Sequence, residues 1–281
     1  MSFGGGTNND FSSGLQTSQK SSEGPGLNVF DPIQEEPFRS KFLDLLRNYY
    51  RGTEFINFSI FKHDDCDNRK KANDKIEGKV EFSSPAEDRA FGVIFGMAIG
   101  DAMGGRLEFQ PVRYHKITLK DMGNGPGGAF QLQPGQWTDD SSMGFCLADS
   151  LIWNKGWNPH DCMQRFVAWV HLGYNNAFRF DDQRGFKCSV GLGGNISMSM
   201  DNYIRTPERY TTAGDKNTSG NGSVMRLAAV PIYYHNDIDE GMKIASLQSK
   251  TTHQGDEAAE CCRLLTFIIV KCIKGEKIKE V

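Results

Sequence analysis

Apolar residues recur at helical spacing from residue 84 onward and predict a long first helix. Ser84 stands at the N-cap position, Pro85 follows at the first helical position, and acidic residues occupy the first turn. The apolar run then continues until Gly104 and Gly105 interrupt it. The pattern therefore predicts a helix that begins at Pro85 and ends near Gly104.

Three glycines share one face of this predicted helix, because Gly92, Gly96 and Gly100 recur every four residues. Each glycine costs roughly 1 kcal/mol relative to alanine inside a helix. Three in register predict a neighbouring element packed closely against that face. Such crowding does not explain two acids near the end of the helix, Asp101 and Glu108.

Later segments repeat the helical pattern. Residues 141–153 carry an apolar stripe made of Met143, Cys146, Leu147, Leu151 and Ile152. Residues 264–270, with the sequence LLTFIIV, are too few to cross a bilayer and predict a core helix. We predict a soluble globular domain that spans residues 84–281 and has no membrane segment.

The chain that precedes this domain has a different composition. Residues 1–28 are rich in Gly, Ser, Asn and Gln, and they predict disorder. Residues 29–83 combine a short helical pattern, in which Phe42, Leu45 and Leu46 form a stripe, with a charged linker at 62–80. We expect the pattern within 29–60 to dock on the main domain or to bind a partner.

Charge and cysteine content narrow the function classes. The chain has 281 residues and a formal net charge of -3, which gives no electrostatic basis for binding nucleic acid or an acidic membrane surface. Its 7 cysteines show no zinc-type spacing, and no secretory signal precedes them. Reduced thiols predict a cytoplasmic protein, with the nucleus as the alternative compartment.

The stretch GQWTDDSSM contains the most informative polar cluster. Thr138, Asp139 or Asp140 would cap the helix that follows, but one acid is enough for a cap. A second acid and a threonine beside it offer the oxygen donors that a hard cation such as Mg²⁺ selects. Capping and metal binding both remain open at this point.

Two later loops carry chemistry of a different kind. The SGNG loop lies at the mouth of an apolar helical segment, where backbone N–H groups favour an anion such as a pyrophosphate. Thr251, Thr252 and His253 precede the next helical run. The SGNG loop could instead be an ordinary turn, and His253 could instead be a hydrogen-bonded structural residue.

A third glycine-rich segment, GNGPGG at residues 123–128, fits the dinucleotide-binding pattern GxGxxG formally. Its proline and the lack of a preceding strand argue against a Rossmann turn.

The order of these motifs resembles the ADP-ribosylglycohydrolases, including the dinitrogenase reductase-activating glycohydrolase branch. The similar segments are GVIFGMAIGDAMGGRLEF, GQWTDDSSMGFCLADSL, CSVGLGGNISMSM, SGNGSVMRLAAVP and SKTTHQGDEAAECC, within residues 87–272. The resemblance implies a compact, orthogonal, all-α multi-helix domain with a binuclear metal site at its centre. It also implies hydrolysis of the bond between the anomeric ribose carbon and an acceptor, which releases ADP-ribose.

The resemblance also implies roles for individual residues. Thr138, Asp139 and Asp140 fall on the first metal motif, for two Mg²⁺ ions with Mn²⁺ as the alternative, and Asp139, Asp140 and Glu108 are the implied catalytic acids. The implied partner is an ADP-ribosylated protein, modified on arginine or serine, or a related ADP-ribose conjugate. The implied substrate-binding residues are Gly191, Gly193, Gly220, Asn221, Gly222, Ser223 and His253.

Two departures from the family pattern qualify these roles. The family often has an aspartate near Val190, and its absence weakens the role of that segment. The family also has a second acidic metal motif near its C-terminus, and the similar string DDCD at residues 64–67 lies on the wrong side of every other motif. Either the missing ligands lie beyond Val281, or the protein is an inactive member that binds ADP-ribose or is purely structural.

Overall fold

The computed structural model describes residues 82–111, 123–178, 181–185 and 189–277. These residues form helices and contain no strand, apart from one isolated antiparallel bridge between Gly127 and Leu132. The expected disordered segment 1–28, the helical pattern within 29–60 and the linker at 62–80 lie outside the described residues. The helices are α3 (Pro85–Gly104), α4 (Asp139–Asn154), α5 (Pro159–Leu172), α6 (Gly194–Arg205), the 3₁₀ helix η6 (Asn221–Ser223), α7 (Ala229–Tyr233), α8 (Ile238–Lys250) and α9 (Asp256–Ile273).

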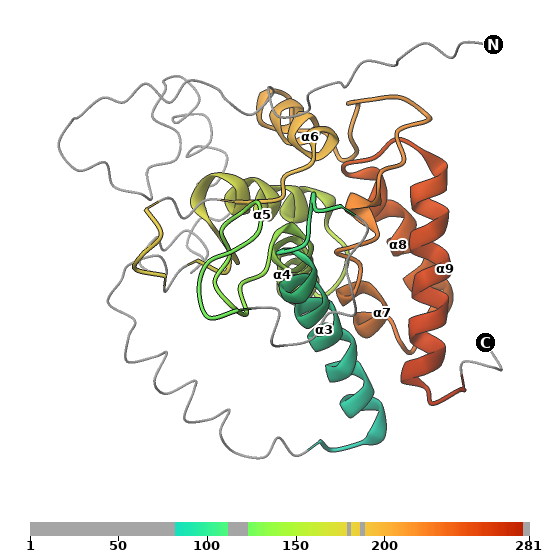
Figure 1. The fold of residues 1–281 in the computed structure, drawn as a ribbon. Helices are drawn as coiled ribbons and strands as arrows, with labels where there is room; N and C mark the ends of the chain where they lie inside the picture. Colours follow the sequence, from blue (N-terminus) through green and yellow to red (C-terminus); the bar gives the residue numbers. More distant parts are fainter. Residues whose placement is uncertain (1–81, 112–122, 179–180, 186–188, 278–281) are drawn as a thin grey trace, which may run out of the picture.

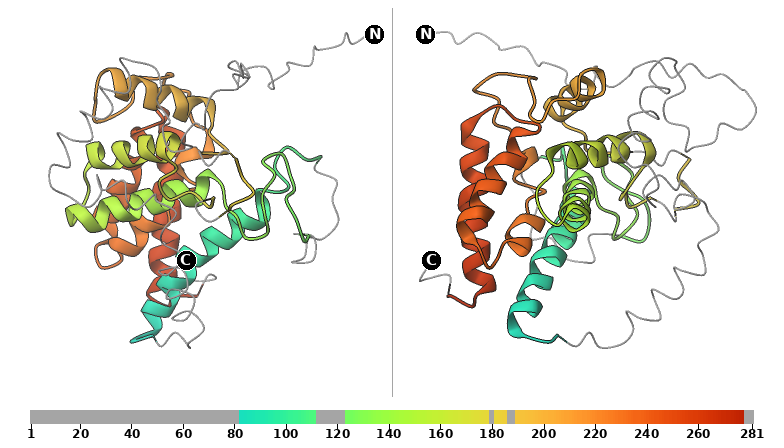
Figure 2. Two further views of the ribbon diagram at one scale, coloured as in Figure 1. Left: turned by 90° about the vertical axis from the view of Figure 1, so that its left-hand side faces the viewer. Right: turned by 180° about the vertical axis from the view of Figure 1, so that it is seen from behind.

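The helices pack around α4 and α5, which lie side by side at the centre of the described domain (Figure 1). α8 and α9 form a neighbouring pair, and the short α7 contacts α4, α8 and α9. α6 lies above α5, while α3 crosses the end of α4 and projects away from the other helices (Figure 2). This arrangement confirms the all-α part of the predicted fold class for the described residues.

The core is built from apolar side chains of α4 to α9. The predicted stripe of α4 is largely confirmed, because Met143, Cys146, Leu147 and Leu151 are buried. Ile152 is 69% exposed, so its assignment to the stripe was wrong. One residue turns an α-helix by about 100°, which carries Ile152 away from the face that Leu151 buries. Members of the core cluster from the other helices include Phe166, Trp169, Met200, Val230, Ile244 and Cys262.

The predicted start of α3 is confirmed. Ser84 Oγ accepts a hydrogen bond from the backbone N–H of Glu87, and Pro85 opens the helix. The predicted crowding of its glycine face is wrong for the described part of the chain. A Cβ atom added at Gly92 or Gly96 would meet no atom within 4 Å.

The reason is that α3 buries residues only at its C-terminal end, although Arg89 in its first half donates a hydrogen bond to the carbonyl oxygen of Ile273 on α9. Asp101 and Ala102 are its buried residues, whereas Phe95 and Ile99 are 52% and 53% exposed. The helix is apolar on most sides, yet its first turns have no close neighbour across the glycine positions. The burial of its last turn brings Asp101 to the start of α4.

The apolar segment LLTFIIV lies in α9 and faces the core with one side only. Val270 is fully buried, whereas Leu264 is 61% exposed. Within the part of the chain that the structure describes, no helix combines the length and hydropathy of a membrane span.

Candidate functional site

The start of α4 is held by a carboxylate from another helix. Asp101, near the end of α3, accepts hydrogen bonds from the backbone N–H of Thr138 (3.0 Å), from its Oγ1 (2.7 Å) and from the N–H of Ser141 (2.9 Å). A negative side chain at the N-terminus of a helix also interacts favourably with the helix dipole. Asp101 therefore both caps α4 and joins it to α3.

This contact corrects the capping interpretation of the TDD sequence. Thr138 occupies the N-cap position, but its side chain makes no capping hydrogen bond, because its hydroxyl donates to Asp101. Neither Asp139 nor Asp140 is needed as a cap. The sequence contained one signal of this arrangement, an acid at the end of an apolar helix, but spacing could not show which helix it caps.

Four carboxylates meet at this end of α4. Asp139 is 6% exposed, and its pKa is raised to about 8, first by burial and then by the neighbouring charge of Asp140. Burial and the charge of Asp101 raise the pKa of Asp140 to about 6. Burial, followed by the charges of Asp140 and Asp101, also raises the pKa of Glu108, which lies in the turn after α3. The mutual repulsion indicates a site that a cation would stabilise.

The donor chemistry fits a hard divalent cation, but the described residues do not complete a coordination shell. Within the described ranges, no group of three or more His, Cys, Asp or Glu side chains is arranged to hold a metal ion. The expected binuclear centre is therefore not found among them. What they contain is carboxylate oxygens in a buried, like-charged cluster, the donor type that Mg²⁺ prefers.

The GLGG segment approaches the same cluster. Gly191 has a φ of 82°, and a Cβ atom there would overlap Oδ1 of Asp139, so only glycine fits without displacement. Gly193 is the N-cap residue of α6, and a Cβ there would meet nothing within 4 Å. The structure thus places Gly191 against the acidic cluster and leaves Gly193 at an open helix start.

The SGNG loop and His253 form a second contact region. A Cβ at Gly220 would lie 3.5 Å from Nε2 of His253, and a Cβ at Gly222 would lie 3.2 Å from its Cε1. The loop does not open a long helix as expected. Asn221 to Ser223 form the 3₁₀ helix η6, and the five-residue α7 begins only at Ala229. The loop and His253, both implied by the resemblance to bind substrate, lie next to each other, whereas the predicted helix N-terminus is absent at this loop.

A buried arginine that sequence reasoning missed supports this region. Arg226 is fully buried, and its guanidinium carbon lies 4.6 Å from the centre of the Phe166 ring. Its Nε donates to Oε1 of Gln248, and its Nη2 donates to the carbonyl oxygen of Gln248 and to Oγ1 of Thr252, each at 2.9 Å. The available signal was a single charged residue within the apolar run SVMRLAAVP.

His253 lies next to this network and is uncharged at neutral pH. Its Nδ1 is 2.9 Å from Oγ1 of Thr252, and the residue is 2% exposed. Burial and the nearby charge of Arg226 lower the pKa of the imidazole to about 4.

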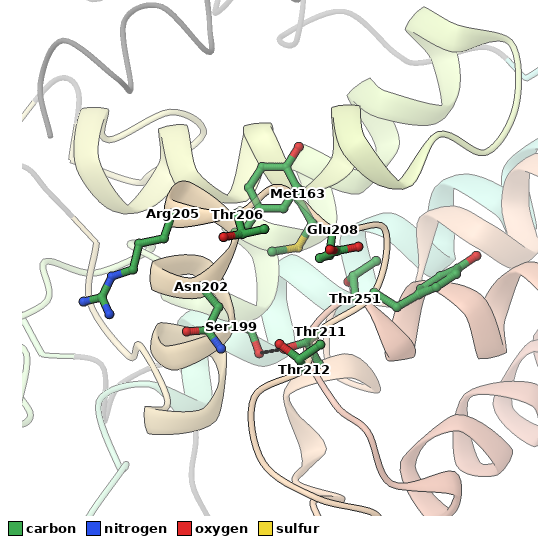
Figure 3. Close-up of a pocket in the computed structure, with 11 residues that line it drawn as sticks. Met163, Ser199, Asn202, Arg205, Thr206, Glu208, Thr211, Thr212 and Thr251 are labelled. Atoms are coloured by element: carbon green, nitrogen blue, oxygen red, sulfur yellow. Dashed lines mark hydrogen bonds between the residues drawn. The ribbon is translucent and has the colours of Figure 1, made fainter.

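A separate hollow has Thr251, two residues before His253, in its wall. Figure 3 shows it beside the C-terminal half of α6, where Oγ1 of Thr211 donates to Oγ of Ser199 at 2.7 Å. Its volume is about 360 Å³, and hydroxyl groups dominate its wall. None of the predicted site residues lines it. The lining residues are Met163, Ser199, Asn202, Tyr203, Arg205, Thr206, Glu208, Tyr210, Thr211, Thr212 and Thr251.

Comparisons with a family model and with known proteins all indicate the same family. Residues 83–281 match the family model described as ADP-ribosylglycohydrolase. The chain is 34% identical over 198 residues to the ADP-ribosylarginine hydrolase Tri1 of Pseudomonas putida, covering 69% of this chain and 49% of that protein. It is 28% identical to the ADP-ribosyl-[dinitrogen reductase] glycohydrolase of Rhodospirillum rubrum, covering 68% of this chain and 60% of the relative.

A more distant relative and a solved structure agree. The chain is 24% identical to the ADP-ribosylhydrolase ARH3 of Gallus gallus, with 72% of this chain and 54% of the relative covered. A solved structure titled ADP-ribosylglycohydrolase-related protein complex superposes with a TM-score of 0.54 at 30% identity, covering 68% of this chain and 58% of the other. The chain spans about half the length of the curated relatives it matches.

Proposed function

Because the chain belongs to the ADP-ribosylglycohydrolase family, we propose that it hydrolyses the glycosidic bond between ADP-ribose and a modified side chain. The observation that carries the proposal is the convergence of Asp139, Asp140 and Glu108 beside the close approach of Gly191. Arginine-linked ADP-ribose is the first acceptor to test, because the bacterial relative at 34% identity is named for that linkage. Serine-linked ADP-ribose is the second.

The chemistry of this bond requires charge stabilisation and proton transfer. Cleavage of a glycosidic bond develops oxocarbenium character on the ribose, so nearby carboxylates favour the transition state. Asp139 and Asp140 would hold Mg²⁺, or Mn²⁺ as the alternative, through their oxygens. A cation held there supplies charge neutralisation and orientation of the ribose hydroxyls.

Glu108 is the residue proposed to move protons. Burial and the charges of Asp140 and Asp101 raise its pKa, so a larger fraction of Glu108 is protonated near neutral pH than for an exposed glutamate. In that state it can donate a proton to the departing group, and the resulting carboxylate can accept one from the attacking water. Asp101 fixes the start of α4 and so positions Asp139 and Asp140 for this reaction.

The other end of the substrate is proposed to lie on the SGNG loop. Gly220 and Gly222 leave room for close approach, and His253 borders the same loop. This contact region suits the nucleotide part of ADP-ribose.

The test is release of free ADP-ribose from arginine- and serine-linked ADP-ribosyl peptides, with Mg²⁺, with Mn²⁺ and with a chelator. We expect cation-dependent release that is lost in Asp139→Asn and Asp140→Asn. Asp182→Asn, which removes an exposed loop acid, is the matched control and should retain activity. Equal release by the two site variants and the control would remove these carboxylates from the reaction.

One observation favours a second candidate function, binding of ADP-ribose without hydrolysis. The described residues do not complete a metal site, and a protein that lacks the cation could still bind the nucleotide through the SGNG loop. Calorimetric titration with ADP-ribose separates the two functions. Affinity without cation-dependent release supports the binding function, whereas release in the peptide assay supports the enzyme.

A further inference from the structure

The turn that carries His253 is held by backbone contacts from two helices. The N–H groups of Thr252 and His253 donate to the carbonyl oxygen of Ser249 at 3.1 and 2.9 Å, at the end of α8. From α6, Ser199 Oγ donates to the carbonyl oxygen of Thr252 at 3.1 Å, and Asn195 Nδ2 donates to the same atom. The backbone of residues 252 and 253 is therefore restrained, and the imidazole orientation depends on its side-chain contacts.

The contact between Arg226 and Thr252 has a defined direction. A guanidinium can only donate hydrogen bonds, so Oγ1 of Thr252 accepts from Arg226 Nη2 at 2.9 Å. The proton of the Thr252 hydroxyl is then available for the other neighbour of Oγ1, which is Nδ1 of His253 at 2.9 Å. In this arrangement Nδ1 is the acceptor.

An imidazole whose Nδ1 accepts a hydrogen bond carries its single proton on Nε2. The ring is neutral at pH 7, because burial and the charge of Arg226 lower its pKa to about 4. Nε2 faces the backbone at Gly220, where a Cβ would lie 3.5 Å away. Nε2 has no hydrogen-bond partner among the described residues. It is also absent from the set of fully enclosed side-chain atoms that lack a partner.

We propose that Arg226 is a positioning residue that acts through Thr252 to hold His253 as its Nε2–H tautomer, which donates to a phosphoryl oxygen of the ligand on the SGNG loop. The inference rests on the proposed function, because the ligand is ADP-ribose. The alternative tautomer would direct a lone pair of Nε2 toward that oxygen, and two acceptors repel. Arg226 thus converts a histidine of undefined tautomer into a fixed neutral donor.

Two neighbouring threonines provide a matched pair of variants. Thr251 and Thr252 are 1% and 0% exposed, and both hydroxyls accept from Arg226 Nη2. Only Thr252 contacts His253. Thr252→Val should remove the preference of His253 for the Nε2–H tautomer. Thr251→Val removes an equally buried hydroxyl and should leave that tautomer unchanged. Loss of the guanidinium in Arg226→Met would disturb the core itself, so the threonine pair is the more direct test.

The experiment records ¹⁵N–¹H correlation spectra of the histidine rings in the full chain at pH 7, together with titration by ADP-ribose. Wild type and Thr251→Val should show the Nε2–H pattern for His253, and Thr252→Val should show a mixture or the Nδ1–H pattern. Loss of one preorganised hydrogen bond predicts about tenfold weaker ADP-ribose binding by Thr252→Val. Thr251→Val should bind with nearly wild-type affinity.

An Nδ1–H pattern or a charged ring in wild type would overturn the inference. Equal changes in both threonine variants would also overturn it, because they would show general loosening of the core. The spectra of the free protein test the tautomer independently of turnover. If the tautomer results are as expected but wild type neither binds nor hydrolyses ADP-ribose conjugates, the proposed function fails and the identity of the ligand fails with it, while the tautomer assignment stands.

Discussion

Replacement of Asp139 by asparagine should stabilise the cation-free protein, by an amount that grows with pH. The folded-state pKa of Asp139 is about 8, against an ordinary value of 3.8. Between these values the unfolded chain loses the proton while the folded protein keeps it, so the free energy of unfolding falls as pH rises. Asparagine has a similar shape and cannot ionise, so the free energy of unfolding of the variant does not fall with pH for this reason.

The magnitude follows from the span of pH over which the two states differ. One pH unit corresponds to about 1.4 kcal/mol. The variant should therefore nearly match wild type near pH 4, exceed it by about 1 to 2 kcal/mol at pH 5, and exceed it by at most about 4 kcal/mol at pH 7. Above pH 8 the difference should level off, because Asp139 is then ionised in both states of the wild type.

Urea unfolding at pH 4, 5, 7 and 8.5 in the presence of a chelator measures this difference. Asp182→Asn, an exposed loop variant, controls for the loss of one negative charge. A difference that does not grow with pH would refute the assignment of Asp139 as a buried, uncompensated carboxylate. The same would follow if the variant were less stable than wild type at pH 7.

Three further predictions address the cluster and its support. Addition of Mg²⁺ at pH 8 should raise the melting temperature of wild type but not that of Asp139→Asn, in differential scanning fluorimetry. Gly191→Ala should weaken this Mg²⁺ response, because its Cβ would overlap Asp139, whereas Gly193→Ala should not. Arg226→Met should lower the free energy of unfolding by about 3 kcal/mol in urea, because Gln248 loses its buried donor; a change below about 0.5 kcal/mol would contradict that role.

Local features of the fold were predictable from the sequence. The start of α3 at Pro85, with Ser84 as its cap, depends only on neighbouring residues. The burial of Met143 and Leu147 follows from the period of the α-helix. The all-α class was implied by the family resemblance, which rests on the order of short motifs along the chain.

The composition of the site required the tertiary structure. Asp101 and Thr138 are separated by 37 positions, and their hydrogen bond depends on how α3 crosses α4. The oxygen atoms that accept hydrogen bonds from Arg226 belong to residues 22 to 26 positions away, on α8 and in the turn after it. No periodicity within one helix specifies which polar groups another helix will place beside it.

The same distinction accounts for the wrong expectation about α3. The sequence by itself determined that Gly92 and Gly96 share a helix face, because that depends on helical geometry alone. Whether another element covers that face depends on where the helix docks, and α3 is buried only at Asp101 and Ala102. Periodicity and capping are local and act within a few residues. Docking, burial and the pKa values of the acidic cluster arise from contacts between distant segments, and only the tertiary structure decided them.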